Sequence, residues 1–304
     1  MIKKIILLGS KDAGGKNDVH DMARHLENKL DRVELTTVFL EDLLLNVGTD
    51  KQSVVDLQSG RDLKDADLVV AMNWYRGGPK SLYRDVMFAV ALYLDKHGVS
   101  FWNSEARQQR SISKVSAMMQ LSLLGLPVPA TLFSLDADHL IHSVKNEPFI
   151  LKSAIASRGA DNFLCQDIHE AKSKLTSKTP NHFMVQEHIE NDRDLRIVCF
   201  GGEPQLVIER RRTSTDTHLN NTSQGAEAKL EEVESLSSKI VDECRQICYN
   251  MGREMAGIDL LPANNSDRYV YLEVNAIPQL TSGSFVDEKM AALAKVLNEQ
   301  KGTR

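Results

Sequence analysis

Apolar and polar positions alternate in two runs near the end of the chain, and this pattern predicts a β-hairpin. Residues 258–261 form the first run and residues 269–275 the second, with Asn, Ser and Asp turn residues between them. Because side chains alternate between the two faces of a strand, we expect Glu273 and Asn275 to share one face with Tyr271. The apolar side chains expected to face a core are Val270, Leu272 and Val274.

The polar face of this hairpin carries candidate metal ligands. A hairpin that is symmetric about Ser266 places Asp259 opposite Glu273. Opposed carboxylates repel each other, and a cation between them would remove that penalty. Asp, Glu and Asn offer oxygen ligands, which suit Mg²⁺ better than zinc. The pattern therefore predicts a magnesium site of Asp259, Glu273 and Asn275, although an ordinary solvated sheet face would explain the same residues.

The first hundred residues alternate between short apolar runs and amphipathic runs, which predicts a small open α/β domain. We expect strands at residues 5–8, 33–40 and 68–72 and helices at residues 18–30 and 81–97. The loop at residues 9–17 resembles a phosphate-binding P-loop. It lacks the Walker signature, because Gly15 and Lys16 stand where that motif needs Lys and Ser or Thr.

Three cations follow the strand predicted at residues 68–72, at an edge where open α/β sheets often bind ligands. Arg76, Lys80 and Arg84 are therefore candidate contacts for an anionic substrate. The alternative is a surface loop that caps the next helix.

The remaining pattern predicts a helix, a small α+β unit that resembles a lid, and a second hairpin before the last helices. The predicted strands are 131–135, 149–152, 163–166, 182–189, 194–200 and 205–210, and the predicted helices are 111–124, 136–144, 168–175, 233–251 and 285–297. Residues 211–225 are polar and irregular.

The composition is typical of an ordinary soluble globular protein. Of 304 residues, 42% are hydrophobic and 26% are charged, and the net charge of −5 gives no support to a nucleic-acid or membrane partner. No apolar run is long enough to span a membrane, and the first residues are too short a run for a signal peptide, so we expect a cytoplasmic protein. The four cysteines form no C-x-x-C pair, and we expect buried free thiols.

Two lysines are candidate phosphate ligands. Lys152 ends a predicted strand and begins a loop of small residues whose backbone N–H groups can surround an anion. Lys114 lies on the helix before the lid. Residues 186–189, Q-E-H-I, end another strand, whose backbone can hydrogen-bond a purine, and Asp194 and Arg196 share one face of the next strand.

The order of these motifs resembles the ATP-grasp superfamily, and most closely its RimK-type carboxylate–amine ligases. The resemblance covers about residues 104–285. The motifs that carry it are Lys114, Lys152 with its loop, Q-E-H-I, D-L-R, Arg211, N-N-T-S-Q-G, G-I-D-L and L-E-V-N.

This resemblance implies a role for each matched residue. The α- and β-phosphates of ATP would contact Lys114 and Lys152 with the loop residues Ser157, Arg158 and Gly159. The adenine would contact Gln186, Glu187, His188 and Ile189, and the ribose would lie near Asp194. Two Mg²⁺ ions, or Mn²⁺ in their place, would bind Asp259, Glu273 and Asn275. Arg211 and Asn221 would face the γ-phosphate and the reacting carboxylate as catalytic residues.

The implied function is ATP-dependent joining of a carboxylate to an amine through an acylphosphate. The partners would be ATP, an acid such as glutamate, and an amine on a peptide, a protein end or a metabolite, in a chain that can form a homo-oligomer. The alternatives are a kinase on this scaffold and a nucleotide-binding protein without turnover. The resemblance implies an N-terminal α/β domain (1–103), a central lid (104–185) and a C-terminal, mostly antiparallel subdomain with the metal site (186–304).

The chain departs from the family pattern in two places. The loop after Lys152 is poor in glycine, with Ala156, Arg158 and Asp161 around Gly159. His218 and Leu219 stand where the family often has an aromatic residue and Arg or Ser. These departures leave the substrates open.

Overall fold

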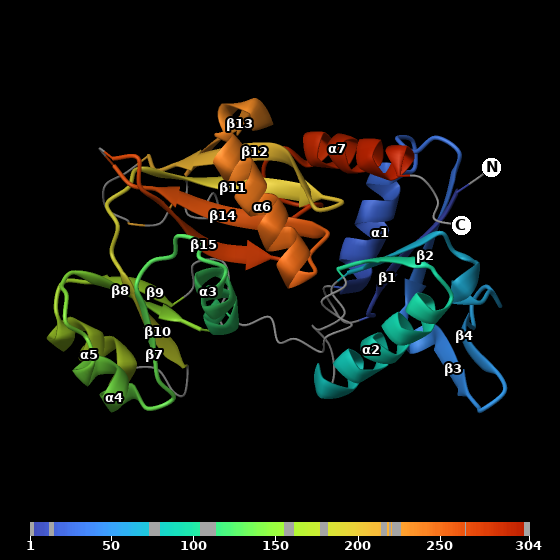
Figure 1. Cartoon of the computed structure of the whole chain (residues 1–304), viewed down its shortest axis with the longest axis horizontal. Helices are drawn as coiled ribbons and strands as arrows, with labels where there is room; N and C mark the ends of the chain where they lie inside the picture. Colours follow the sequence, from blue (N-terminus) through green and yellow to red (C-terminus); the bar gives the residue numbers. More distant parts are fainter. Residues whose placement is uncertain are drawn as a thin grey trace.

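The computed structural model contains three large sheets and one two-stranded sheet. It describes residues 3–11, 15–72, 80–103, 114–154, 161–176, 182–213, 218, 220, 226–264 and 266–300, with backbone alone for residues 15–17, 80, 81 and 176. The first large sheet lies at one end of an elongated molecule, the second at the other end, and the third along one side between them (Figure 1).

The N-terminal sheet is parallel, with strand order β2-β1-β5-β6, as the strand–helix alternation predicts. Its elements are β1 (Lys3–Gly9), α1 (Gly15–Leu26), β2 (Val33–Phe39), β5 (Leu68–Ala71), α2 (Lys80–Lys96) and β6 (Ser100–Trp102). The helix predicted at residues 18–30 begins at Gly15 and ends at Leu26 instead. Leu30 joins the core from the turn that follows this helix.

An antiparallel hairpin between β2 and β5 was not predicted. It consists of β3 (Leu43–Val47) and β4 (Gln52–Asp56), and the 3₁₀ helices η1 (Leu40–Asp42) and η2 (Leu63–Asp65) flank it. The first strand reads L-L-L-N-V, which has no alternation of apolar and polar residues, so its pattern carries no strand signal.

The central sheet has the strand order β7-β10-β8-β9 and is antiparallel. Its strands are β7 (Thr131–Phe133), β8 (Phe149–Ser153), β9 (Asn162–Cys165) and β10 (Phe183–Glu187). The helices α4 (Ala137–His142) and α5 (Ile168–Thr176) pack together on one face of this sheet (Figure 1). A core of its own, built around Phe149, Leu151 and Phe183, holds this unit together.

The C-terminal sheet is also antiparallel, in the order β13-β12-β11-β14-β15. Its strands are β11 (Arg193–Phe200), β12 (Glu203–Arg211), β13 (Glu227–Glu231), β14 (Met255–Pro262) and β15 (Tyr269–Asn275). The elements η5 (Val233–Ser235), α3 (Lys114–Leu123) and α6 (Ser238–Met251) flank this sheet, and one core joins it to both α helices. The sequence analysis missed β13, which lies at the sheet edge.

The last helix, α7 (Val286–Glu299), packs against elements of both the N-terminal and the C-terminal domain. It contacts α1 as well as β11 and β12, so one apolar core spans the N-terminal and C-terminal sheets (Figure 1). This core fixes the parallel sheet relative to the C-terminal sheet, which carries the candidate metal ligands.

A β-bulge changes one prediction for the hairpin. The register pairs Asp259 with Glu273 but Leu260 with Tyr271, so Leu272 is the extra residue. Tyr271 therefore faces the same core as Val274 and is fully buried, whereas Leu272 packs with Val270 in a separate cluster. The prediction that Tyr271 shares the polar face of Glu273 is wrong, because the bulge shifts the alternation by one residue.

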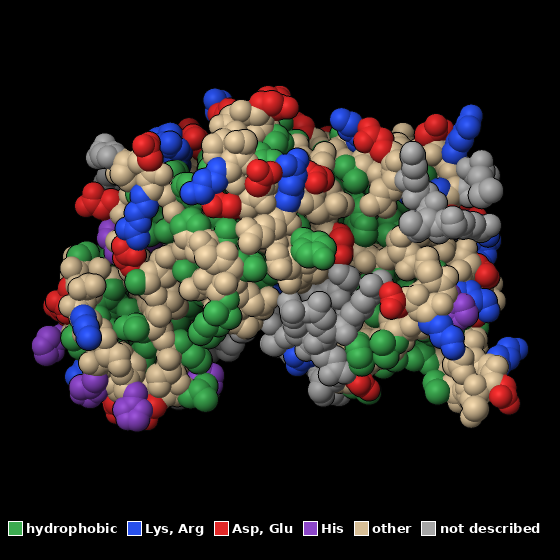
Figure 2. Space-filling model, in the orientation of Figure 1, with side chains coloured by type: hydrophobic (Ala, Val, Ile, Leu, Met, Phe, Trp, Pro, Cys, Tyr) green, Lys and Arg blue, Asp and Glu red, His purple; other side chains and the backbone are tan. Residues whose placement is uncertain are grey.

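The surface shows no large area of one charge on the face drawn in Figure 2, where acidic and basic side chains are interspersed. Within the described residues, no helix is both long and apolar enough to cross a membrane. All four cysteines are buried free thiols, as predicted.

Candidate active site

The hairpin brings the two predicted carboxylate ligands face to face. Asp259 on β14 is the strand partner of Glu273 on β15, and Gly257 is the partner of Asn275, so the predicted register is confirmed. Asp259 is buried, and Glu273 and Asn275 are half-buried. Two carboxylates and one amide oxygen thus lie at one end of the hairpin.

Asp259 belongs to a buried cluster of two aspartates and two arginines, which we call the buried quartet. Arg196 donates from Nε and Nη2 to both oxygens of Asp259, each at 2.8 Å. Arg210 donates to both oxygens of Asp194 at 2.6 and 2.9 Å and lies 3.3 Å from Asp259 Oδ2. The four side chains are between 7% and 15% exposed, so these charges interact with little screening by water.

The quartet distributes its negative charge unequally. Burial alone would raise the pKa of Asp259, but Arg196 and Arg210 outweigh it and hold that pKa well below its usual range. Burial raises the pKa of Asp194 to about 6, although Arg210 opposes the shift. Asp259, with two guanidinium partners, is therefore the more acidic of the two carboxyl groups.

The donor set fits a hard divalent cation. Among the described residues, no group of three or more His, Cys, Asp or Glu side chains could hold a metal ion. A metal site at Asp259 and Glu273 would therefore need Asn275 as its third ligand. Asp259 receives two bonds from Arg196 and a 3.3 Å contact from Arg210, which leaves about one of the roughly four acceptor positions of an ionised carboxylate for a cation. Oxygen ligands of this kind match Mg²⁺.

The two predicted phosphate lysines lie together beside this site. Lys114 Nζ is 3.4 Å from the carbonyl oxygen of Ser153, the residue that follows Lys152. Lys152 is 9% exposed, and burial lowers its pKa to about 8, while Glu273 and Asp259 oppose that shift. A buried cation whose neighbours include both carboxylates is positioned for the phosphates of a metal–nucleotide complex.

A cleft of about 590 Å³ opens between the central and C-terminal sheets. Its lining includes Asn162 and Phe163 of β9 and His188, which follows β10. Asn162 is the strand partner of Lys152, so the cleft begins next to the buried lysine. The cleft and the charged cluster are therefore adjacent parts of one site.

Two histidines line this cleft, and both are neutral at pH 7. Burial lowers the pKa of His218 to about 4, with His188 and Arg212 contributing. Burial also lowers the pKa of His188. The ring of His218 lies 2.9 Å from Asn162 Oδ1, so its Nε2 donates to that oxygen. Neutral rings suit an uncharged heterocycle better than a phosphate.

The Q-E-H-I segment adopts the strand end that the sequence predicts, with partners inside the protein. Gln186 is buried and donates to Thr131 at 2.8 Å. Glu187 accepts two hydrogen bonds of 2.8 Å from Arg268, and its backbone N–H donates to Ala130. Ile189 is buried beside β14 and β15. Of the four, His188 is the one that lines the cleft.

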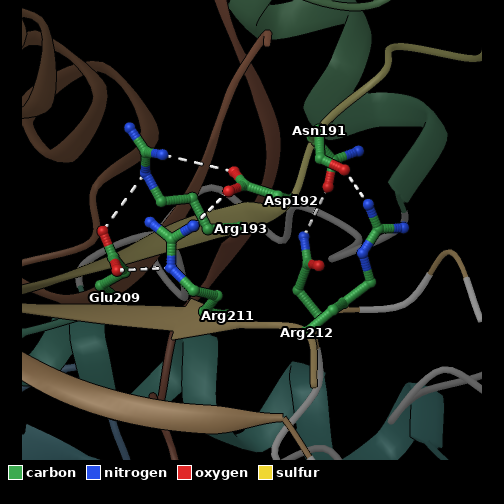
Figure 3. Close-up of polar contacts among 7 residues, drawn as sticks. Asn191, Asp192, Arg193, Glu209, Arg211 and Arg212 are labelled. Carbon is green, nitrogen blue, oxygen red and sulfur yellow. Dashed lines mark hydrogen bonds and ion pairs between the residues drawn. The ribbon is translucent and has the colours of Figure 1, made fainter. Parts of the chain in front are cut away.

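Arg211 lies on the opposite face of β12 from Arg210. Figure 3 shows it in a closed ring of ion pairs, the exposed ring, in which Arg211 and Arg193 each contact both Asp192 and Glu209. The ring residues are between 19% and 45% exposed. The structure thus separates Arg211 from Asp259 and brings Arg210 to it.

Asn220 was not predicted as a site residue, yet its side-chain oxygen is buried without a hydrogen-bond partner. Its Nδ2 donates to Asn191 Oδ1 at 2.8 Å, and Asn191 in turn donates to the carbonyl of Ile189. Arg212 also donates to the backbone of Asn191 (Figure 3). Among the described residues, Asn220 Oδ1 is the buried side-chain polar atom without a hydrogen-bond partner. Such an acceptor indicates a missing donor or cation.

Several predicted site residues fall outside the described part of the chain. They are Arg76, Ser157, Arg158, Gly159 and Asn221. Lys80 begins α2, but its side chain is not described. Arg84 is half-buried on α2.

Comparison with known proteins decides the family. The family model of the RimK-like ATP-grasp domain matches residues 112–298. The chain belongs to the RimK-like ATP-grasp family. A curated relative from Legionella pneumophila (strain Corby), named a probable alpha-L-glutamate ligase, is 28% identical over 202 residues; the match covers 63% of this chain and 64% of the relative.

Solved ATP-grasp ligases have the same fold. The ligase PsnB, in complex with a phosphomimetic variant of its minimal precursor, Mg and ADP, superimposes with a TM-score of 0.69 at 19% identity, covering 98% of both chains. The VanG D-Ala:D-Ser ligase from Enterococcus faecalis superimposes with a TM-score of 0.62 at 15% identity, covering 98% of this chain and 100% of that one. The predicted ATP-grasp fold is confirmed.

The alternation of side chains along a strand could have identified two functional residues, Arg196 and Arg210. Arg196 was seen on the same face as Asp194, and the structure confirms this, but its partner was not identified. Arg210 was passed over in favour of its neighbour. Extending the predicted strand 205–210 by one residue would have placed Arg210 and Arg211 on opposite faces.

Proposed function

We propose that this protein is an ATP-dependent carboxylate–amine ligase that forms an amide bond through an acylphosphate. The observation that carries the proposal is the pair Asp259 and Glu273, opposed on a buried hairpin beside Lys152, in a member of the RimK-like ATP-grasp family. This arrangement has the charges that a metal–triphosphate complex requires.

ATP lies in the cleft between the central and C-terminal sheets. Its base contacts the neutral His188 and His218, and its phosphates extend to Lys114 and Lys152. Asp259, Glu273 and Asn275 would hold Mg²⁺, which would neutralise charge on the phosphates; the family resemblance implies two ions. Glu187 and Asp194 do not line the cleft, so we assign them to positioning Arg268 and Arg210 rather than to direct contact with ATP.

The reaction has two steps. An oxygen of the substrate carboxylate attacks the γ-phosphorus, the bond to the β-phosphate oxygen breaks, and ADP leaves. The amine nitrogen then attacks the acyl carbon, the bond to phosphate breaks, and the amine loses a proton. The products are an amide, ADP and inorganic phosphate.

The side chains of the buried face stabilise the charge that develops in these steps. Arg210 takes the role that the sequence analysis proposed for Arg211, because it lies 3.3 Å from Asp259. A fixed guanidinium there stabilises the transferring phosphoryl group and the tetrahedral oxyanion.

The substrates follow from what similar proteins are named for. Several relatives are called probable alpha-L-glutamate ligases, and the solved neighbours include the ligase PsnB and the macrocyclase MdnC, each in complex with a precursor peptide. We therefore propose that the chain joins an amino acid such as glutamate to a peptide, a protein end or a small amine. The cytoplasm supplies the ATP and Mg²⁺ that this needs, and the domain limits at residues 103 and 185 remain our proposal.

A substrate screen tests this proposal. Wild-type protein with ATP and Mg²⁺ is given pairs of amino acids and peptides, and ADP and phosphate are measured. The correct acid with hydroxylamine in place of the amine should give a hydroxamate and about one ADP per product. A stable phosphorylated product without hydroxamate would indicate a kinase, and nucleotide binding without ADP release would indicate a non-catalytic protein.

A further inference from the structure

The segment that follows the metal strand contains a strained residue beside the proposed active site. Residues 276–285 lead from Asn275 to α7, and Gln279 has a φ of 21°. A positive φ is a conformation that residues with a side chain rarely adopt, and glycine tolerates it better because it has no Cβ. Strain of this kind is retained where the surroundings enforce it, and it concentrates at functional sites.

The surroundings of Gln279 do enforce it. A Cβ built on Gly257 would lie 2.5 Å from Pro278 Cβ, so the backbone of β14 and Pro278 are in close contact. Leu280 is 2% exposed in the core that α7 shares. Lys289, which is 3% exposed, donates to the carbonyl of Gln279 at 2.6 Å and to that of Ser282 at 2.9 Å. The backbone is therefore fixed before, at and after Gln279.

The side chain of Gln279 contributes nothing to the core, because the residue is exposed. Its Oε1 accepts a hydrogen bond of 3.3 Å from Nη1 of Arg196, the arginine that holds Asp259. Since the oxygen of this amide faces Arg196, its NH₂ group points elsewhere with two donors. The strained backbone thus positions a carboxamide at the edge of the buried quartet.

The chemistry around this carboxamide favours a carboxylate. Arg196 and Lys289 are the cations that flank Gln279, and burial together with Arg196 lowers the pKa of Lys289 to about 8. Two amide donors next to a guanidinium can bind the oxygens of a carboxylate, whereas they offer no acceptor to an ammonium group.

We propose that Gln279 is a specificity-determining residue that donates a hydrogen bond to a carboxylate of the amino-acid substrate. The inference rests on the proposed ligase function and deepens it, because it assigns a contact for the substrate other than ATP. On this proposal, Gln occupies the strained position in place of glycine because its carboxamide is needed there.

Two substitutions separate this role from a structural one. Gln279→Gly removes the carboxamide and relieves the strain that its Cβ causes, so it should raise the melting temperature by about 2 °C while it weakens substrate binding. Gln279→Glu keeps the shape but presents a negative charge, which repels a carboxylate. Arg32→Gly is the matched control: Arg32 is exposed, has a φ of 53° and lies on the turn before β2.

The experiment measures KM for L-glutamate and for ATP, the affinity for ADP with Mg²⁺, and the melting temperature of all four proteins. We expect KM for L-glutamate to rise about tenfold in Gln279→Gly and further in Gln279→Glu, with KM for ATP and ADP affinity within twofold of wild type. Arg32→Gly should match the gain in melting temperature and leave both KM values unchanged.

The outcomes are distinguishable. An unchanged KM for L-glutamate in Gln279→Gly would overturn this inference while the ligase function stands. An equal rise in KM for ATP would overturn it as well, because it would show general damage to the site. Wild-type protein that turns over none of the screened pairs would contradict the proposed function itself.

Discussion

The two faces of the C-terminal sheet each carry two arginines and two carboxylates, but in different environments. The buried quartet joins Arg196 and Arg210 to Asp194 and Asp259, with side chains at most 15% exposed. The exposed ring joins Arg193 and Arg211 to Asp192 and Glu209, with side chains up to 45% exposed (Figure 3). Two positive and two negative side chains therefore form a cluster with little solvent on one face of the sheet and a solvated surface cluster on the other.

This difference separates functional from structural charge. Ion pairs at the surface contribute little because water and salt screen them. Buried charges interact strongly and cannot lose a partner without a large cost. The composition of a cluster is thus a poor guide to its role, and its burial is a better one.

The largest expected effect comes from the metal ligands. Glu273→Gln keeps the shape of the side chain but removes a charge that holds Mg²⁺, so we expect turnover to fall by about a thousandfold or more with the fold retained. Glu209→Gln in the exposed ring is the matched control and should retain turnover within about twofold. Steady-state ADP release checks both variants, and equal activity of the two would remove Glu273 from the metal site.

The next effect is on stability. Arg210→Met leaves Asp194 buried without its bidentate partner, so we expect the free energy of unfolding to fall by about 3 kcal/mol. Arg211→Met removes two exposed ion pairs and should cost less than about 1 kcal/mol. Urea unfolding of the two variants measures the difference, and similar losses would contradict the contrast between the faces.

A tenfold effect is expected from pH. Burial lowers the pKa of Lys152 to about 8, so Lys152 is protonated below that pH and loses its charge as the pH rises through it. A phosphate binds the protonated form, so ADP affinity should fall about tenfold for each pH unit above that pKa. Lys152→Met should bind ADP weakly at every pH. Calorimetry from pH 7 to 9.5 tests this, and equal slopes in both proteins would assign the titration to another group.

The smallest effect concerns salt. The stability lost in Asp192→Asn should be below about 1 kcal/mol at low salt and should approach zero in 1 M NaCl, because the exposed ring is screened. Urea unfolding at two salt concentrations measures it. A loss that persists in 1 M NaCl would show that the ring is more than a surface cluster.

The sequence was sufficient to predict the hairpin that carries the candidate metal ligands. The bounds of β15 and the opposition of Asp259 to Glu273 were predicted, because a short hairpin with a clear turn has one register that fits its pattern. The bulge at Leu272 was not predictable, since it adds a residue without a sequence signal, and it moved Tyr271 to the core.

The choice between adjacent residues needed the structure. Arg210 and Arg211 differ by one position at a strand end, and the predicted strand stopped between them. Asn220 lies in an irregular stretch without periodicity, so its burial could not be predicted. At Arg210 and Arg211 the backbone path, rather than the residue type, decides which side chain reaches the buried quartet.

The most direct test of the account is the yield of trapped acylphosphate in Arg210→Lys and Arg211→Lys. Both variants keep a positive charge, but lysine cannot reproduce the bidentate geometry of the buried arginine. With the correct acid, ATP and hydroxylamine, Arg210→Lys should form hydroxamate about a hundredfold more slowly than wild type, and Arg211→Lys should stay within about twofold. The opposite order would return the catalytic role to Arg211 and contradict the assignment of the buried face as the active one.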